Sequence, residues 1–322
     1  MKPQISKIIT GTSIIALILG LVIFGITHLN HNKKPANIIT SNFISYDFAR
    51  AVTGDASNIS MLIKPGTESH SFEPTPEDII NIKNADLFIY VGGESDKWVE
   101  DLLKDNEVSR AKTLRLMDLV EVKEEELPEG IEEHEHEHES EEAHEEHEYD
   151  EHIWTSLINA IKLVNGVKDK LSKIHPENKD AYTKNADSYT SRLSTIDQKI
   201  RDIVANSNKK ELIFGDRFPF RYFVDEYGLD YYAAFPGCSE QTEASSSTIA
   251  LLIDKAKSNN IKTILKIELT SDKLAKSIAD EVGAKVMTLN AAHNISNEDF
   301  INGITYADLM ESNANVLREA LK

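Results

Sequence analysis

Short apolar runs separated by stretches with helical spacing occur in two regions of the chain. The segments between the runs place apolar residues three and four positions apart, as amphipathic helices do. Strands that alternate with helices form parallel sheets covered on both faces. The pattern therefore predicts an α/β fold with two Rossmann-like lobes, each a mostly parallel sheet with helices on both faces. The predicted strands are 37–40, 58–63 and 87–91 in the first region and 211–214, 231–235, 263–267 and 285–289 in the second.

One apolar stripe between the two regions predicts a long helix. No glycine or proline interrupts the chain from Lys179 to Val204. At a rise of about 1.5 Å per residue, such a helix is roughly 40 Å long. We interpret residues 179–208 as one long rigid helix that joins the lobes, and a coiled-coil partner is the alternative. The stripe consists of Tyr182, Ala186, Tyr189, Leu193, Ile196, Ile200 and Ile203.

The N-terminus carries an apolar run from Ile8 to Ile26, preceded by Lys2 and Lys7. Its length is close to the roughly 20 residues of a membrane-spanning helix. Basic residues before such a run predict a signal peptide or N-terminal membrane anchor over residues 1–36, with a buried core helix as the alternative. The only cysteine is Cys238, so we expect no lipid anchor. The remaining chain is predicted to be extracytoplasmic, at the cell surface, and either membrane-anchored or secreted.

Charge is concentrated in one segment. The net charge is −19, and residues 121–151 contain 17 acidic residues and one lysine, which leaves −3 for the rest of the chain. No basic cluster is present to neutralise phosphates, so nucleic acid is not an expected partner. One cysteine excludes a disulfide framework and a cysteine-rich zinc module. The predicted divisions are an N-terminal lobe (37–120), an acidic His-rich loop (121–151), a helix completing that lobe (152–178), and a C-terminal lobe (209–322).

The acidic loop is rich in histidine. Neutral imidazole suits zinc, and carboxylates add oxygen ligands. So many like charges with few apolar residues prevent independent folding, so we expect a disordered segment with weak, multiple metal contacts. A solvated acidic tract without a metal role is the alternative. The predicted metal-capture residues are His134, His136, His138, His144 and His147.

Two other histidines lie at element boundaries. His70 lies between a predicted strand and a helix whose start is marked by Thr75 as N-cap and Pro76 at the first helical position. His152 lies where the acidic loop gives way to a predicted helix that begins near Trp154. Loops at strand ends carry many binding residues. Each histidine taken alone is either a surface or capping residue or a metal ligand.

Several motifs lie around these histidines and elsewhere along the chain. They are Gly66-x-x-x-His70 followed by Phe-Glu-Pro-Thr-Pro, Asn84-Ala85-Asp86-Leu87 before Gly92-Gly93, the His-rich insertion ending in Glu-His-Ile-Trp, and Tyr227-Gly228-Leu229. With these motifs, residues 37–322 resemble the extracellular solute-binding proteins of zinc and manganese ABC importers (cluster A-I). This resemblance implies two α/β lobes joined by one long helix, a metal ion in the cleft between them, and His70 and His152 as ligands.

The chain departs from this family at the third ligand. Arg217 stands where zinc-type members carry histidine, and a guanidinium has no lone pair to offer a metal. We predict that His293 supplies the third imidazole while Arg217 pairs with a cleft carboxylate, and a helix-capping role for His293 is the alternative. For the fourth ligand we prefer Glu268, which ends an apolar strand. The other candidates are Asp216, Cys238, Glu240 and Glu243.

The sequence thus predicts a monomeric receptor, not an enzyme, that captures Zn²⁺ and delivers it to the membrane permease of an ABC importer. Three imidazoles and one further donor suit tetrahedral zinc. A manganese-type receptor of the same fold is the alternative within this class. Alternatives from other classes are a surface adhesin and an extracellular zinc hydrolase. No His-Glu-x-x-His, Gly-x-Ser-x-Gly or Walker motif supports an enzyme.

Overall fold

The computed structural model describes residues 35–54, 57–67, 72–104, 108–129, 131, 149–237 and 244–322. The predicted N-terminal anchor and most of the acidic loop lie outside these ranges. Within them, no helix has the length and apolar character needed to cross a membrane. Residues Ala36–Lys322 form one compact unit.

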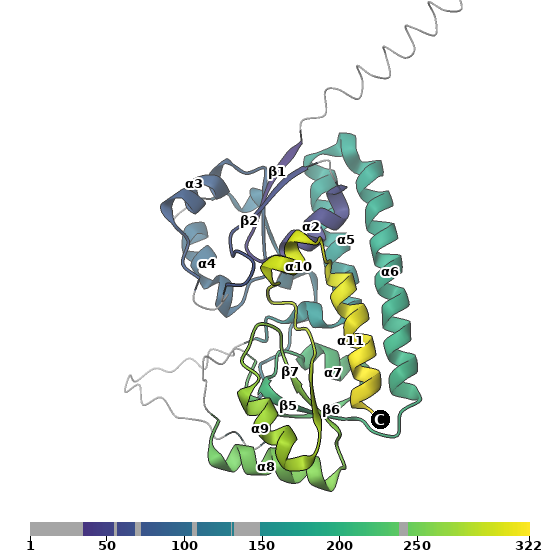
Figure 1. Ribbon diagram of the computed structural model, residues 1–322. Coiled ribbons are helices and arrows are strands. Elements are labelled where there is room, and N and C mark those ends of the chain that lie inside the picture. Colours follow the sequence, from purple (N-terminus) through teal and green to yellow (C-terminus); the bar gives the residue numbers. More distant parts are fainter. Residues whose placement is uncertain are drawn as a thin grey trace, which may run out of the picture. The chain divides into compact units, whose positions relative to one another are not determined.

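The first sheet is four-stranded and entirely parallel (Figure 1), with the order β2-β1-β3-β4. Its strands are β1 (Ala36–Thr40), β2 (Ser57–Met61), β3 (Leu87–Tyr90) and β4 (Thr113–Arg115). The helices along this part of the chain are α2 (Phe43–Thr53), α3 (Pro76–Asn84) and α4 (Lys97–Lys104). Thr75 is the N-cap of α3 and Pro76 opens the helix, as the sequence predicts, and Thr75 forms a capping box with Asp78.

Both faces of the first sheet are buried because successive side chains of a strand point to opposite faces. One face contributes Ile38, Leu87 and Ile89 to a cluster that includes α2 residues such as Phe48. The other face contributes Ile39, Phe88 and Tyr90, which pack with Ile82 of α3 and with Val99 and Leu103 of α4. Burial on both faces explains why these strands are continuous apolar runs.

The second sheet is also four-stranded and parallel, with the order β6-β5-β7-β8. Its strands are β5 (Glu211–Arg217), β6 (Asp230–Phe235), β7 (Thr263–Lys266) and β8 (Lys285–Thr288). Leu212 and Leu265 face the large core cluster, while Ile213 and Ile264 face a second cluster. The helices of this part are α7 (Arg221–Tyr227), α8 (Ser246–Ser258), α9 (Lys273–Val282), α10 (Asn297–Ile301) and α11 (Tyr306–Ala320).

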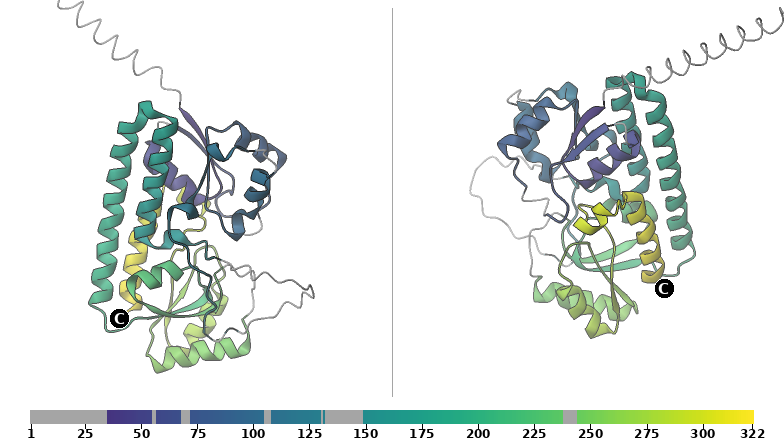
Figure 2. Two further views of the ribbon diagram at one scale, coloured as in Figure 1. Left: turned by 180° about the vertical axis from the view of Figure 1, so that it is seen from behind. Right: turned by 45° about the horizontal axis from the view of Figure 1, so that its top comes forward.

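Two long helices separate the sheets in the sequence. They are α5 (Leu157–Ile174) and α6 (Lys179–Ala205), preceded by a short 3-10 helix, η5 (Ile153–Thr155). The apolar stripe predicted for α6 is buried at Tyr182, Ala186, Leu193, Ile196 and Ile200. Figure 2 shows α6 along one side of α5, and α11 also packs against α6. The fold prediction of two α/β lobes is confirmed, and both described sheets are wholly rather than mostly parallel.

The C-terminal segment extends from the second sheet back to α2 of the first. The rings of Tyr46 and Phe300 lie 5.3 Å apart between centroids. Arg50 donates a hydrogen bond to the carbonyl of Ile304. The backbone N–H of Tyr306 donates to Asp47. Residues 297–306 therefore contact the first lobe, although the sequence groups them with the second.

Candidate functional site

Loops at the carboxyl-terminal ends of the two sheets meet, and the described predicted ligands His152, His293 and Glu268 lie around them. The loop after β2 and the loop after β8 are joined by a hydrogen bond from Gly66 N to the carbonyl of Ile295, at 2.8 Å. The carboxyl ends of parallel strands are the usual place for binding residues in α/β folds. The described parts of the candidate site lie in these loops and in the segment 150–155.

His152 is fully buried, and one carboxylate fixes its ring. Oδ1 of Asp150 accepts a hydrogen bond from the backbone N–H of His152 at 2.7 Å and lies 2.8 Å from its Nδ1. A carboxylate can only accept, so Nδ1 carries the proton and the lone pair lies on Nε2. Burial lowers the pKa of His152, but the charge and hydrogen bond of Asp150 outweigh it, so the pKa is raised overall. Nε2 is buried and has no hydrogen-bond partner among the residues that the structure describes.

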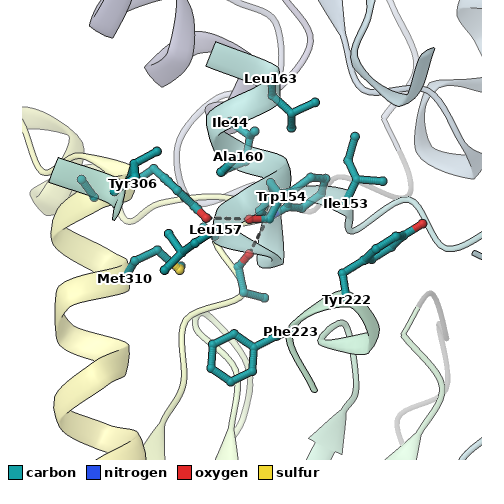
Figure 3. Packing of buried hydrophobic residues seen from close by; sticks show 14 of the residues in the cluster. Ile44, Ile153, Trp154, Leu157, Ala160, Leu163, Tyr222, Phe223, Tyr306 and Met310 are labelled. Atoms are coloured by element: carbon teal, nitrogen blue, oxygen red, sulfur yellow. Dashed lines mark hydrogen bonds between the residues drawn. The ribbon is translucent and has the colours of Figure 1, made fainter. Parts of the chain in front are cut away.

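Trp154 fastens the His152 segment to the second lobe. Its indole Nε1 donates to the carbonyl of Ala291 at 2.7 Å. Its own carbonyl accepts from the hydroxyl of Tyr306 at 2.6 Å. Both bonds are drawn in Figure 3, where Trp154 lies near the start of α5 and Tyr306 reaches it from α11. Tyr222 of α7 adds a third bond, from its hydroxyl to the carbonyl of Asp150.

His293 lies directly beside His152. The two ring centroids are 4.4 Å apart and the ring planes are nearly perpendicular, at 81°. Trp154 borders both rings, at 5.6 Å from His152 and 5.7 Å from His293. The structure therefore brings together two of the sequence-predicted ligands, one from each half of the chain.

Glu268 holds the backbone of the His293 loop. Its Oε2 accepts from Ala291 N at 2.7 Å and its Oε1 accepts from His293 N at 3.0 Å. Burial raises the pKa of Glu268 to about 7. Between these two N–H groups, Ala292 has a left-handed φ of 60°, which is unfavourable for a residue with a β-carbon. The two hydrogen bonds thus maintain a strained turn that presents His293.

The end of β5 carries Asp216 and Arg217. The carboxylate of Asp216 is buried and accepts hydrogen bonds from Ile267 N and from the hydroxyl of Thr270, so it fastens the loop after β7. The side chain of Arg217 is partly exposed. Asp216 is thereby committed to a structural contact.

The turn after β6 lies against the His152 ring. A β-carbon built on Gly237 would lie 3.2 Å from Cε1 of His152 and 3.5 Å from Oε1 of Glu125. The absence of a side chain at Gly237 therefore lets this turn approach the buried imidazole closely. Glu125 belongs to the base of the acidic loop, which is closed by a β-bridge between Glu124 and Tyr149.

Several predicted site residues lie outside the described residues, and the structure does not test them. Within residues 35–54, 57–67, 72–104, 108–129, 131, 149–237 and 244–322, no group of three or more His, Cys, Asp or Glu side chains is arranged to hold a metal ion. The predicted residues outside these ranges are His70, Cys238, Glu240, Glu243 and the capture histidines His134, His136, His138, His144 and His147.

Two functional contacts escaped the sequence analysis. The first is the pair of hydrogen bonds that Asp150 accepts from His152. The sequence feature that could have indicated it is an acidic residue two positions before the histidine. The second is the role of Glu268, whose position at a strand end was recognised without its partners. Those partners lie 23 and 25 residues further along the chain, so no local pattern could identify them.

Comparison with known proteins places the whole described unit in one family. The sequence profile of the family described as "Zinc-uptake complex component A periplasmic" matches residues 38–320. The chain is 34% identical over 285 residues to the high-affinity zinc uptake system protein ZnuA of Bacillus subtilis, covering 88% of this chain and 87% of that protein. It is 32% identical over 292 residues to the zinc-binding lipoprotein AdcA of Streptococcus pneumoniae strain R6, covering 89% of this chain.

The chain spans 57% of the length of that AdcA protein. The match to its ZnuA-like domain is structural as well. The Zn(II)-bound crystal structure of this domain superposes with a TM-score of 0.73 at 30% identity, covering 89% of this chain and 99% of the other. These findings confirm the predicted resemblance. The chain belongs to the family of the periplasmic zinc-uptake complex component A.

Proposed function

We propose that this protein is an extracytoplasmic receptor that binds Zn²⁺ and delivers it to the permease of an ABC importer. The observation that carries the proposal is the pair of His152 and His293. Their rings lie 4.4 Å apart between centroids, and the lone pair of His152 lies on the buried Nε2. Imidazole nitrogen is a preferred zinc ligand, and a carboxylate behind the ring is the usual second partner of such a ligand.

His70 completes a set of three imidazoles in this proposal. It lies three residues after Thr67, whose loop is joined to the loop of His293. Glu268 acts on the site through the backbone of His293, because both of its carboxylate oxygens already accept N–H groups.

Cys238 is our candidate for the fourth donor. It follows Gly237 directly in the sequence, and Gly237 lies against the His152 ring. Arg217 has no lone pair to offer a metal ion, whereas a thiolate at Cys238 has one. Imidazole and thiolate donors favour zinc, whereas manganese prefers oxygen ligands. A manganese-type receptor is therefore the second candidate, and it requires a mainly oxygen ligand shell.

The remaining segments have supporting roles in the proposal. The His-rich part of the acidic loop collects zinc and raises its concentration near the site. The N-terminal segment keeps the receptor at the membrane or directs its secretion. We propose a monomer, because the ligands discussed all belong to one chain.

The test is competitive titration of Zn²⁺ and Mn²⁺ against chelators, using residues Ala36–Lys322 with residues 132–148 deleted. The deletion leaves the bridge between Glu124 and Tyr149 in place. We expect one tight zinc per chain in the parent, and at least tenfold weaker binding in His70→Ala, His152→Ala and His293→Ala. His175→Ala is the matched control. His175 is the C-cap of α5, so it lies at the opposite end of that helix from the His152 segment. Tight zinc binding that survives all three site substitutions would refute the proposed site, and preferential manganese binding would favour the second candidate.

A further inference from the structure

The loop after β2 begins with a tight turn at Lys64–Thr67. Pro65 and Gly66 occupy its central positions, and Gly66 has a φ of 77°. Thr67 N donates to the carbonyl of Lys64 at 3.2 Å, which closes the turn. Proline followed by a glycine with positive φ is the signature of a type II turn. The local sequence thus dictates the shape of the turn but not its position relative to the rest of the site.

Asn294, which is distant in sequence, holds both ends of this turn. Its side-chain nitrogen donates to the carbonyl of Lys64 at 2.9 Å and to the carbonyl of Thr67 at 2.6 Å. Its side-chain oxygen accepts from Ile295 N at 2.8 Å, which orients the amide group. Asn294 is only 4% exposed. One buried side chain therefore uses both of its N–H donors on the two ends of one turn.

The position of Asn294 in the chain links this contact to the proposed metal site. It directly follows His293, whose own N–H is held by Glu268. Three residues after Thr67 comes His70. The segment 293–294 thus carries one proposed ligand and also holds the start of the loop that carries another.

We propose that Asn294 is a positioning residue that couples the His293 loop to the His70 loop and thereby sets the affinity for Zn²⁺. This inference rests on the proposed function. Without Asn294, the hydrogen bond from Gly66 N to the Ile295 carbonyl would still join the two loops. The turn at residues 64–67 would then sample more conformations, and zinc binding through His70 would have to restrict them. Loss of a residue that orients a metal ligand typically weakens metal binding by about 10- to 100-fold.

The experiment is a double-substitution cycle on residues Ala36–Lys322, which form one compact unit. Zinc affinity is measured for Asn294→Ala alone, in the His70→Ala background and in the His293→Ala background. We expect about 10- to 100-fold weaker binding for Asn294→Ala in the parent and in His293→Ala, and less than about a twofold change in His70→Ala. Equal weakening in the His70→Ala background would overturn the inference, since Asn294 would then act through the fold at large.

A matched control and a metal-independent readout separate this role from general destabilisation. Asn178 is also 4% exposed and donates to the hydroxyl of Tyr182, at the junction of α5 and α6. We expect Asn178→Ala to lower stability without changing zinc affinity. Hydrogen exchange without metal should be faster at Gly66 and Thr67 in Asn294→Ala and unchanged at residues 153–155.

The outcomes distinguish the inference from the proposed function. A parent that binds no zinc tightly would refute the proposed function, and the inference with it. A parent and an Asn294→Ala variant that bind zinc equally tightly would refute the inference alone. Unchanged exchange at Gly66 and Thr67 in the variant would show that Asn294 does not hold the turn, which also refutes it.

Discussion

Substitution of Asp150 tests the proposed zinc site at its most defined point. A single oxygen, Oδ1, holds both the ring Nδ1–H and the backbone N–H of His152. The side chain of Asp150 is 3% exposed and that of His152 is 0% exposed, so the carboxylate is shielded from bulk water. Asp150→Ala therefore leaves two buried donors without an acceptor and frees the ring to rotate.

The expected magnitude follows from these contacts. An unsatisfied buried donor costs about 1–3 kcal/mol. We expect Asp150→Ala to lower the free energy of unfolding by roughly 2–4 kcal/mol, because the backbone can shift and relieve part of the loss. Loss of the carboxylate behind a metal-bound imidazole weakens binding by about 10- to 100-fold. Asp150→Ala should reach the upper end of this range.

Asp150→Asn separates geometry from charge. Its side-chain oxygen can still accept both N–H groups of His152, so the ring keeps its orientation and only the negative charge is lost. We expect a zinc affinity about tenfold below the parent, between those of the parent and Asp150→Ala. The charge control is Asp225→Asn, which removes a partly exposed carboxylate paired with Lys123 and Arg221.

The assay is chelator competition for affinity and chemical denaturation for stability, both on residues Ala36–Lys322. Zinc affinity of Asp150→Ala within twofold of the parent would contradict the reasoning, since His152 would then not need its carboxylate to bind metal. If Asp150→Asn and Asp225→Asn weakened zinc binding equally, the effect of Asp150→Asn would come from net charge alone.

Three further predictions concern other groups. Burial raises the pKa of Asp96 from 3.8 to about 7, so between these pH values the native state binds more protons than the unfolded state. The free energy of unfolding should therefore fall as pH rises through this range, by up to about 1.4 kcal/mol per pH unit. Chemical denaturation of Asp96→Asn should show a weaker dependence of stability on pH. Cobalt bound to the parent should show a near-ultraviolet sulfur-to-metal charge-transfer band that Cys238→Ser lacks, and its absence from the parent would exclude the thiolate as a ligand. Glu268→Gln places an N–H₂ group against the N–H of Ala291 or His293, and zinc titration should show about tenfold weaker binding.

The fold was largely predictable because its signals are local. The predicted strand 87–91 is observed as Leu87–Tyr90, and the predicted strand 231–235 as Asp230–Phe235. The three-residue strand β4, Thr113–Arg115, was missed because so short a segment shows no periodicity. Strand β5 continues three residues beyond its predicted end, and its pairing with β6 shifts register between Phe214 and Arg217. Gly215 lies in this extension and lets α9 approach closely, because a β-carbon there would lie 2.5 Å from Cα of Ala275.

The site was predictable only in part, because its geometry depends on distant contacts. His152 and His293 were selected from the sequence, and they lie side by side. The sequence could not show that Glu268 turns toward backbone N–H groups, or that Asn294 reaches the turn at residues 64–67. Such partners are separated by up to 230 residues, so only the folded chain brings them together.

The pairing of His152 with His293 has a consequence for how zinc would be captured. His152 precedes the helices between the two sheets, yet three buried hydrogen bonds fasten its segment to α7, α11 and the loop after β8. Moving His152 away from His293 would break several of these bonds, at about 1–3 kcal/mol for each polar group left unsatisfied. Protein groups therefore hold two imidazoles together independently of the ion, and binding energy is not consumed in assembling that pair. In the proposed site His70 is the third imidazole, and Asn294 holds the turn at residues 64–67 that precedes it in the sequence.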